Sequence, residues 1–119
     1  MLQIIPQLKI FLAYESVDFR FGIDRLAALC REKLGQDPYC GAAFVFRNRR
    51  STAVRILIYD GLGYWLCLRR FSRGRLRWWP TKTDQPLTQL AAQELQILLY
   101  QGSPVGAQLA EDWRRLPLP

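Results

Sequence analysis

The sequence contains no histidine, the residue that most often binds transition metals or acts as a general base near neutral pH. Its three cysteines, Cys30, Cys40 and Cys67, include no Cys-x-x-Cys pair, so they do not supply a zinc-binding set. Glycine-rich phosphate-binding motifs are also absent. Without a histidine base, neither a serine nor a cysteine hydrolase can be assembled in the usual way. We therefore predict no catalytic residue, no bound metal, no cofactor and no small-molecule substrate.

Long apolar runs are missing as well. No uninterrupted stretch approaches the roughly 20 residues that a membrane-spanning helix requires. Residues 1–6 have neither the basic start nor the apolar segment of a secretory signal. We expect a cytoplasmic protein with no membrane partner, in which the cysteines are reduced and pack as small apolar residues.

The length of 119 residues suits one domain with a single modest core. Half of the residues are hydrophobic, as in a folded globular chain. We expect one domain over residues 1–119, with its core in residues 8–80 and a C-terminal helical segment in residues 87–119.

The first part of the chain has the pattern of a strand followed by a helix. A short apolar run predicts a strand at residues 9–13, and apolar residues at helical spacing predict a helix at residues 21–34. Ser16 and Asp18 offer N-cap oxygens for this helix, and Gly35 is expected to end it.

From residue 42 onward, apolar residues alternate with polar ones, and turn residues recur as in an antiparallel meander. This alternation predicts four strands, at residues 42–47, 53–59, 64–70 and 75–79. Asp60 is expected to begin the tight hairpin between the second and third of them.

A connector bounded by prolines, residues 80–86, is expected to end the sheet. Helical spacing behind Thr88 then predicts a helix at residues 88–101, and a shorter one is expected at residues 107–115. The predicted class is therefore α+β: a mostly antiparallel sheet of about five strands, with one helix after the first strand and one or two C-terminal helices.

Positive charge is concentrated in one part of the chain. Residues 47–77 hold nine arginines and one acid, Asp60, whereas the rest of the chain is close to neutral. The candidate nucleic-acid-binding residues are Arg47, Arg49, Arg50, Arg55, Arg69, Arg70, Arg73, Arg75 and Arg77. Guanidinium groups suit phosphate because their planar fork donates two parallel hydrogen bonds. Aromatic residues are interleaved with them, and Trp78 or Trp79 offers a surface on which bases could stack.

Each of these features also has a plainer interpretation. Aromatic residues suit the inward row of a strand, and arginines suit its solvated outer row. The strand register is left open by the sequence, so the arginines of residues 47–55 could face away from those of residues 69–77. Asp18, Asp24 and Asp37 have no spacing that requires a metal ion, and Cys40 has no histidine to form its thiolate.

Several segments of the chain occur together in an order that resembles one known family. They include Phe-Val-Phe-Arg-Asn-Arg-Arg at residues 44–50 and Arg-Gly-Arg-Leu-Arg-Trp at residues 73–78. Over about residues 10–80 the chain resembles the small accessory protein encoded by the second reading frame of the insertion sequence 66 family of bacterial transposable elements. It departs from the family at Phe19-Arg20-Phe21, where Met-Arg-Lys is usual.

The resemblance implies a protein that assists transposition beside a separate, larger transposase that carries the acidic catalytic centre. Together with the charge pattern, it predicts a non-enzymatic accessory factor that binds DNA through backbone phosphates. The alternative is an adaptor that docks on the element's transposase, because arginine and aromatic residues also dominate protein interfaces. A metal-dependent nuclease is a third and weaker alternative.

Overall fold

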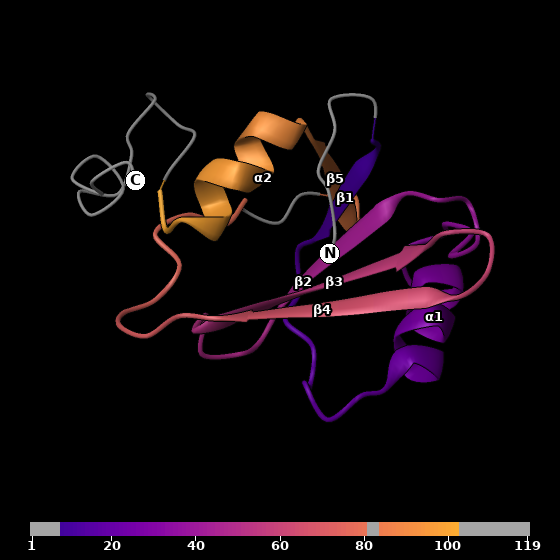
Figure 1. The fold of residues 1–119 in the computed structure, drawn as a ribbon, viewed down its shortest axis with the longest axis horizontal. Coiled ribbons are helices and arrows are strands. Elements are labelled where there is room, and N and C mark those ends of the chain that lie inside the picture. Colours follow the sequence, from indigo (N-terminus) through magenta and orange to yellow (C-terminus); the bar gives the residue numbers. More distant parts are fainter. Residues whose placement is uncertain (1–7, 81–83, 103–119) are drawn as a thin grey trace.

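The computed structural model describes residues 8–80 and 84–102, and these residues form a five-stranded sheet with one helix against each face (Figure 1). In chain order the elements are β1 (Ile10–Ala13), α1 (Ile23–Glu32), β2 (Ala43–Arg47), β3 (Ala53–Tyr59), β4 (Tyr64–Arg70), β5 (Leu87–Leu90) and α2 (Ala92–Leu99). Neither helix of the described ranges is long and apolar enough to cross a lipid bilayer.

The strands lie in the order β4-β3-β2-β1-β5. β1 and β2 are parallel, because α1 carries the chain back between them, and all other neighbouring pairs are antiparallel. The predicted class, α+β with a mostly antiparallel sheet, is confirmed.

Two apolar cores lie on opposite faces of the sheet, because successive side chains of a strand point to opposite sides. The core under α1 buries Ala13, Leu26, Ala27, Cys30, Leu34, Ala42, Phe44, Phe46 and Leu57. The core under α2 buries Ile10, Leu12, Ala43, Val45, Val54, Ile56, Ile58, Leu90, Leu95 and Leu98. β2 and β3 are therefore buried on both faces, and the predicted alternation of apolar with polar residues does not describe these two strands.

Helix α1 begins later than the predicted residue 21, and its cap differs from the prediction. The N-cap residue is Gly22, which has no side chain to bond the first turn. Asp18 instead accepts hydrogen bonds from the backbone N–H of Arg20 (2.9 Å) and from its guanidinium group (2.7 Å). The predicted capping by Ser16 or Asp18 is therefore wrong, because the Asp18 carboxylate is already bonded within its own turn.

Two turns follow the predictions made for them. Gly35, just beyond α1, has a φ of +65°, a conformation that favours glycine at a helix end. In the β3–β4 hairpin, the Asp60 carboxylate accepts hydrogen bonds from the backbone N–H groups of Leu62 and Gly63, both at 2.9 Å, and Gly61 has a φ of +96°. The Asp60 turn thereby joins β3 and β4 as the predicted hairpin.

The predicted strand at residues 75–79 is absent. Leu76 and Trp78 are half-buried and Arg75 and Arg77 are exposed, as alternation requires, but this segment pairs with no strand. Its backbone instead bonds a loop: the Leu76 N–H donates to the Ser51 carbonyl at 2.7 Å. An alternating pattern shows which side chains are buried but not which backbone lies beside them.

The fifth strand is β5, Leu87–Leu90, which overlaps the start of the range predicted to be helix, residues 88–101. β5 pairs with β1, so the connector at residues 80–86 does not end the sheet as predicted. Helix α2 begins only after Ala91, whose N–H donates to the Glu94 carboxylate at 2.9 Å. The helix predicted at residues 107–115 lies outside the described residues.

Candidate nucleic-acid interface

Six of the nine candidate arginines gather at one end of the sheet. The backbone N–H groups of Phe71 and Leu76 donate to the carbonyls of Thr52 (3.0 Å) and Ser51 (2.7 Å), which holds the segment after β4 against the β2–β3 loop. The arginines on these two segments and at the end of β4 are all exposed, and they are Arg49, Arg50, Arg70, Arg73, Arg75 and Arg77. We call these six residues the arginine surface.

A second contact holds the segment after β4 without using its guanidinium groups. The Gln101 side-chain amide, just beyond α2, donates to the backbone carbonyls of Arg73 (2.8 Å) and Arg75 (3.2 Å). Gly74 between them has a φ of +71°, so the chain turns there as predicted. The backbone of the segment is bonded while its arginine side chains extend into solvent.

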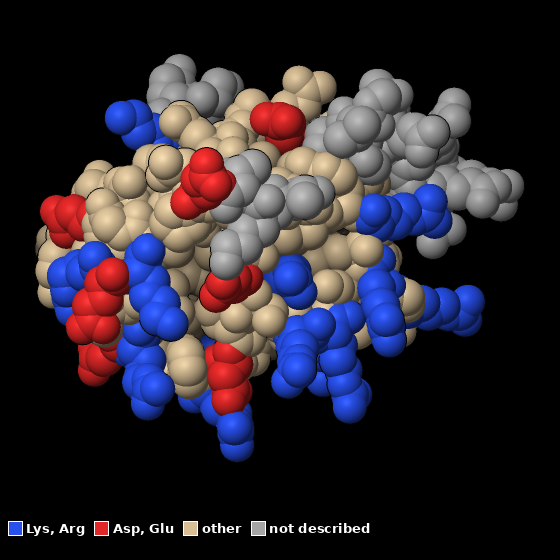
Figure 2. Space-filling model, turned by 180° about the vertical axis from the view of Figure 1, so that it is seen from behind, with Lys and Arg blue, Asp and Glu red and all other residues tan. Residues whose placement is uncertain are grey.

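No carboxylate of residues 8–80 or 84–102 forms an ion pair with the arginine surface. The ion pair present in these ranges joins Arg20 and Asp18 at 2.7 Å, and this bonding lowers the pKa of Asp18 to about 2. The β2–β3 loop and the segment after β4 are at the left in Figure 1 and therefore at the right in Figure 2, which shows the molecule from behind. Lys and Arg side chains gather without acids between them at the lower right of Figure 2. Toward the other end of that view, where α1 lies, basic and acidic side chains are mixed.

Arg55 is not part of the arginine surface. It lies on the α1 face of β3, where its guanidinium group donates to the Phe21 carbonyl at 2.8 Å and stacks 4.9 Å from the centre of the Phe19 ring. Both aromatic residues belong to the stretch in which this chain departs from the usual Met-Arg-Lys. Arg55 therefore anchors the segment that precedes α1.

Arg69 also has a structural role, on the opposite face. Its Nε donates to the Leu99 carbonyl at 2.6 Å, and its guanidinium group lies 5.0 Å from the centre of the Tyr100 ring. A cation at the C-terminal end of a helix bonds a carbonyl that the helix leaves free and interacts favourably with the helix dipole. Arg69 therefore fixes the end of α2 to the edge of the sheet.

Arg47 and the two candidate tryptophans lie against the core under α2. Arg47 is half-buried, with its guanidinium group 5.7 Å from the centre of the Trp79 ring. The Trp79 indole N–H donates to the Ala13 carbonyl at 3.0 Å, and both Trp78 and Trp79 pack on buried core residues. The plainer interpretation fits them: the rings serve the core, and base stacking by either of them stays a prediction.

An aromatic group at the other end of the sheet was not singled out from the sequence. The rings of Tyr39, Tyr59 and Tyr64 contact one another, with centres 4.8 to 5.6 Å apart. Burial raises the pKa of Tyr64 to about 12. Tyr59 and Tyr64 are opposite each other in the β3–β4 hairpin, which the sequence predicts, but Tyr39 comes from the loop after α1 and only the tertiary fold brings it there.

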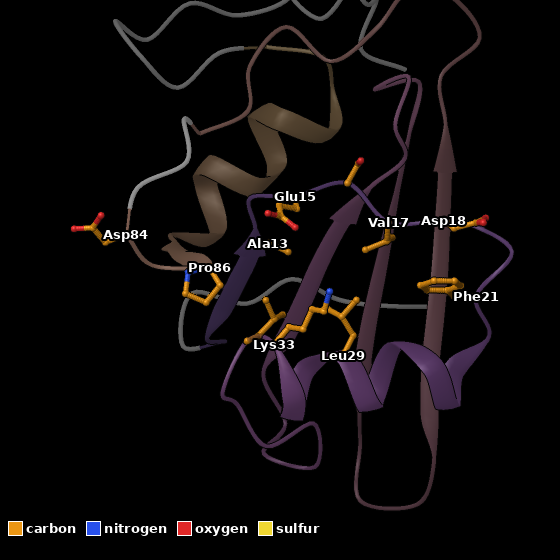
Figure 3. A pocket seen from close by; sticks show the side chains of 11 residues that line it. Ala13, Glu15, Val17, Asp18, Phe21, Leu29, Lys33, Asp84 and Pro86 are labelled. Carbon is orange, nitrogen blue, oxygen red and sulfur yellow. The ribbon is translucent and has the colours of Figure 1, made fainter.

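A surface cleft of about 600 Å³ lies between α1 and the loop after β1. Its charged lining residues are Glu15, Asp18, Lys33 and Asp84, and Figure 3 shows Asp18 and Asp84 at opposite ends of it. No group of three or more His, Cys, Asp or Glu side chains in the described part of the chain is placed to hold a metal ion. The absence of an enzymatic site stays a prediction.

The cysteines follow the prediction in part. Cys30 is buried under α1, and this burial raises the pKa of its thiol to about 12. Cys67 of β4 is half-buried beside the core under α2. Cys40 is exposed, so the prediction that it packs in the core is wrong: it lies in the turn that returns the chain from α1 to β2.

The fold and the surface together define a small α+β domain with an arginine-rich end. The chain belongs to the IS66 Orf2-like family, because the family model described as IS66 Orf2 like protein matches residues 8–107. Membership in this family associates the chain with insertion sequences of the IS66 type, as the sequence resemblance implied.

Two curated relatives, both from Sinorhizobium fredii (strain NBRC 101917 / NGR234), are similar to the chain. The uncharacterized protein y4jC is 40% identical over 75 residues, which is 63% of this chain and 64% of that protein. The uncharacterized protein y4hO is 34% identical over 70 residues, which is 59% of this chain and 61% of that protein. The chain therefore spans less than two thirds of the length of these relatives. No solved structure matches it.

Proposed function

We propose that this protein is a non-enzymatic accessory factor of IS66-type transposition that binds DNA through backbone phosphates at the arginine surface. The observation that carries the proposal is the gathering of six exposed arginines at one end of the sheet, unpaired with any carboxylate of the described residues. Arg47, Arg55 and Arg69 support this surface by holding the segments around it and do not belong to it.

The geometry favours contacts to phosphates over reading of bases. The arginine surface is built on a loop and an irregular segment, and neither helix of residues 8–80 and 84–102 carries it. Sequence is usually read by a helix or ribbon inserted in the major groove, whereas phosphate contacts position a protein without regard to sequence. Weak sequence preference and strong salt dependence are the expected properties.

Anisotropy titrations of the protein against labelled duplex DNA at several salt concentrations test the proposal. If all six arginines contact phosphates, the affinity should fall about a thousandfold between 50 and 200 mM salt, with a log–log slope near −5. The triple variant Arg73→Ala, Arg75→Ala, Arg77→Ala should bind more weakly and flatten the slope by about 3 units.

The matched control removes three charges from α1 and the residue after it, in the variant Arg25→Ala, Arg31→Ala, Lys33→Ala. These side chains are exposed and lie away from the arginine surface, so this variant should keep most of the affinity and of the slope. Binding of micromolar affinity or weaker that ignores salt and survives the Arg73, Arg75 and Arg77 substitutions would contradict the proposal.

Docking on the element's transposase is the second candidate function. It is favoured by exposed apolar side chains at the end of the sheet opposite the arginine surface, where Tyr39 is 56% exposed and Leu62 is 97% exposed. Co-purification with the transposase after nuclease treatment, lost in the variant Tyr39→Ser, Leu62→Ser and kept in the arginine triple variant, would support it. Failure to co-purify would count against it.

A further inference from the structure

Strand β4 is an open edge of the sheet. Within the described ranges it pairs with β3 on one side, and Figure 1 shows no described element along its other side. β4 has seven residues, as many as β3, and its Trp65 and Leu68 side chains are 47% and 58% exposed. A long edge strand with exposed apolar side chains is a template for pairing with another strand.

The hydrogen bonds at the two ends of the β3–β4 pair show which groups of β4 are unused. The Asp60 N–H donates to the Gly63 carbonyl and the Phe71 N–H donates to the Thr52 carbonyl, both at 3.0 Å. Because bonded pairs alternate along an antiparallel ladder, every second residue between these ends bonds β3. The residues whose backbone N–H and C=O groups point away from β3 are Tyr64, Leu66, Leu68 and Arg70.

The side chains of β4 are complementary to a reversed copy of themselves. With two antiparallel copies centred on Cys67, Arg70 faces Tyr64 of the other copy and Arg69 faces Trp65 of the other copy. The same register sets Leu66 opposite Leu68 and Cys67 opposite Cys67. Arg70 over the Tyr64 ring and leucine against leucine are favourable cross-strand pairs, while Arg69 keeps its bond to the Leu99 carbonyl. This register also aligns the four outward-facing residues as hydrogen-bonded pairs.

We propose that β4 pairs antiparallel with β4 of a second copy of this chain, joining two five-stranded sheets into one. The arginines, which on an edge strand normally oppose such pairing, lie at one end of β4 only. A parallel pair would therefore set arginine against arginine, whereas the antiparallel pair separates them. The two Arg69 residues lie four positions apart along the strands, roughly 13 Å, which exceeds the screening length at physiological salt.

A cysteine cross-link tests both the pairing and its register. Directly opposed residues in a non-hydrogen-bonded antiparallel pair have Cα atoms about 4.5 Å apart, which is within the range of a disulfide. In the variant Cys30→Ala, Cys40→Ser, mild oxidation by copper phenanthroline should give a disulfide-linked dimer through Cys67. The matched variant Cys30→Ala, Cys67→Ser keeps only the exposed Cys40, which is in the loop between α1 and β2 and not on β4, and it should stay monomeric on a non-reducing gel.

Sedimentation of the full chain, without oxidation, measures the dimer itself. Leu68→Pro removes an N–H that points away from β3, and Leu68→Lys places a charge at the centre of the pair; both should give monomers with an unchanged circular dichroism spectrum. A full chain that is monomeric at every concentration would overturn the proposal, as would a dimer that forms no Cys67 link or survives Leu68→Lys. If the backbone amides of β4 are protected from hydrogen exchange only when a different protein is added, the β4 edge binds that protein. This result would also overturn self-pairing.

Discussion

Arg55 and Arg69 each donate to a backbone carbonyl, which distinguishes them from the arginines that extend into solvent. Arg55 bonds Phe21 and Arg69 bonds Leu99, so each connects a strand to a segment distant in the chain. A guanidinium group that serves the fold in this way is already partnered and does not add to the free charge of the surface. Unfolding measurements can distinguish the two kinds of arginine.

Replacing Arg69 by alanine should lower the free energy of unfolding by about 1 kcal/mol. The variant loses a charge-assisted hydrogen bond to the end of α2, and the exposed position reduces the value of that bond. Arg77→Ala is the matched control, because Arg77 is exposed, has the same charge and lies outside β4, and it should change stability by less than about 0.5 kcal/mol. Urea unfolding of the three proteins compares them, and equal losses in both variants would show that Arg69 does not anchor α2.

Cys30 should resist alkylation in the folded protein. Burial raises the pKa of its thiol to about 12, so almost none of it is the reactive thiolate at pH 8, whereas Cys40 is exposed. Iodoacetamide labelling followed by peptide mass spectrometry should find Cys40 modified first and Cys30 modified only after unfolding in urea. The unfolded state loses this proton at a lower pH than the folded state, so the effect also lowers stability progressively as pH rises from about 9 toward 12. Equal labelling rates without urea would contradict the burial of Cys30.

Among the helices and strands, β5 is the one that the local sequence pattern predicts least well. The leucines from Leu90 to Leu99 recur at helical spacing, and this periodicity predicted a helix from residue 88. The first part of that range is instead a strand, because β1 offers it an antiparallel partner. Pairing with a strand more than 70 residues away outweighs a weak local preference, and no window of the sequence contains that information.

The local sequence pattern predicts β2, β3 and β4 well. β3 and β4 have the predicted bounds and β2 differs by one residue, because each is bounded by a turn whose chemistry is local. The Asp60 side chain holds the β3–β4 turn through two backbone N–H groups of its own loop. The bounds of these three strands could be predicted because their turns are local, whereas β5 could not be predicted because its partner β1 is distant in the chain.

Proline substitutions test the assignment of β5 directly. The Tyr14 N–H donates to the Pro86 carbonyl at 3.1 Å, so by alternation the Thr88 N–H bonds β1 while the Gln89 N–H points away from it. Thr88→Pro should therefore cost about 2 kcal/mol of unfolding free energy, and Gln89→Pro should cost less than about 1 kcal/mol. Thermal or urea unfolding measures both variants. Similar losses from the two substitutions would contradict the strand.

At the scale of the whole molecule, the sequence identified the charged segment but not the surface that it makes. Nine arginines were candidates, and the register of the strands decides which of them reach solvent together. Arg47 and Arg69 point to the α2 face and Arg55 to the α1 face, where each finds a partner. The remaining six come together because the segment after β4 bonds the β2–β3 loop, a contact between two irregular segments that has no sequence pattern.

The two proposals together have a geometric consequence. In an antiparallel pair of β4 strands, the ends that carry the arginine surface point in opposite directions. The dimer would then present two separate positive ends and no continuous positive track. Such a dimer is suited to bind two separate stretches of DNA, one at each end. A protein with a single long positive groove would instead bind along one stretch.

The position of β5 also affects how the chain reaches this fold. Tyr59 and Tyr64 pair across a short hairpin, whereas Ala13 and Leu87 pair across most of the sheet. Closing the longer loop costs about 2 kcal/mol more in chain entropy, so β5 is expected to join last. All buried residues of the core under α1 precede the end of β4, while the core under α2 includes Leu90, Leu95 and Leu98. During synthesis, the nascent chain through β4 thus already holds every fully buried residue of the core under α1, which only the partly buried Leu87 joins later. The opposite apolar face stays uncovered until β5 and α2 have left the ribosome.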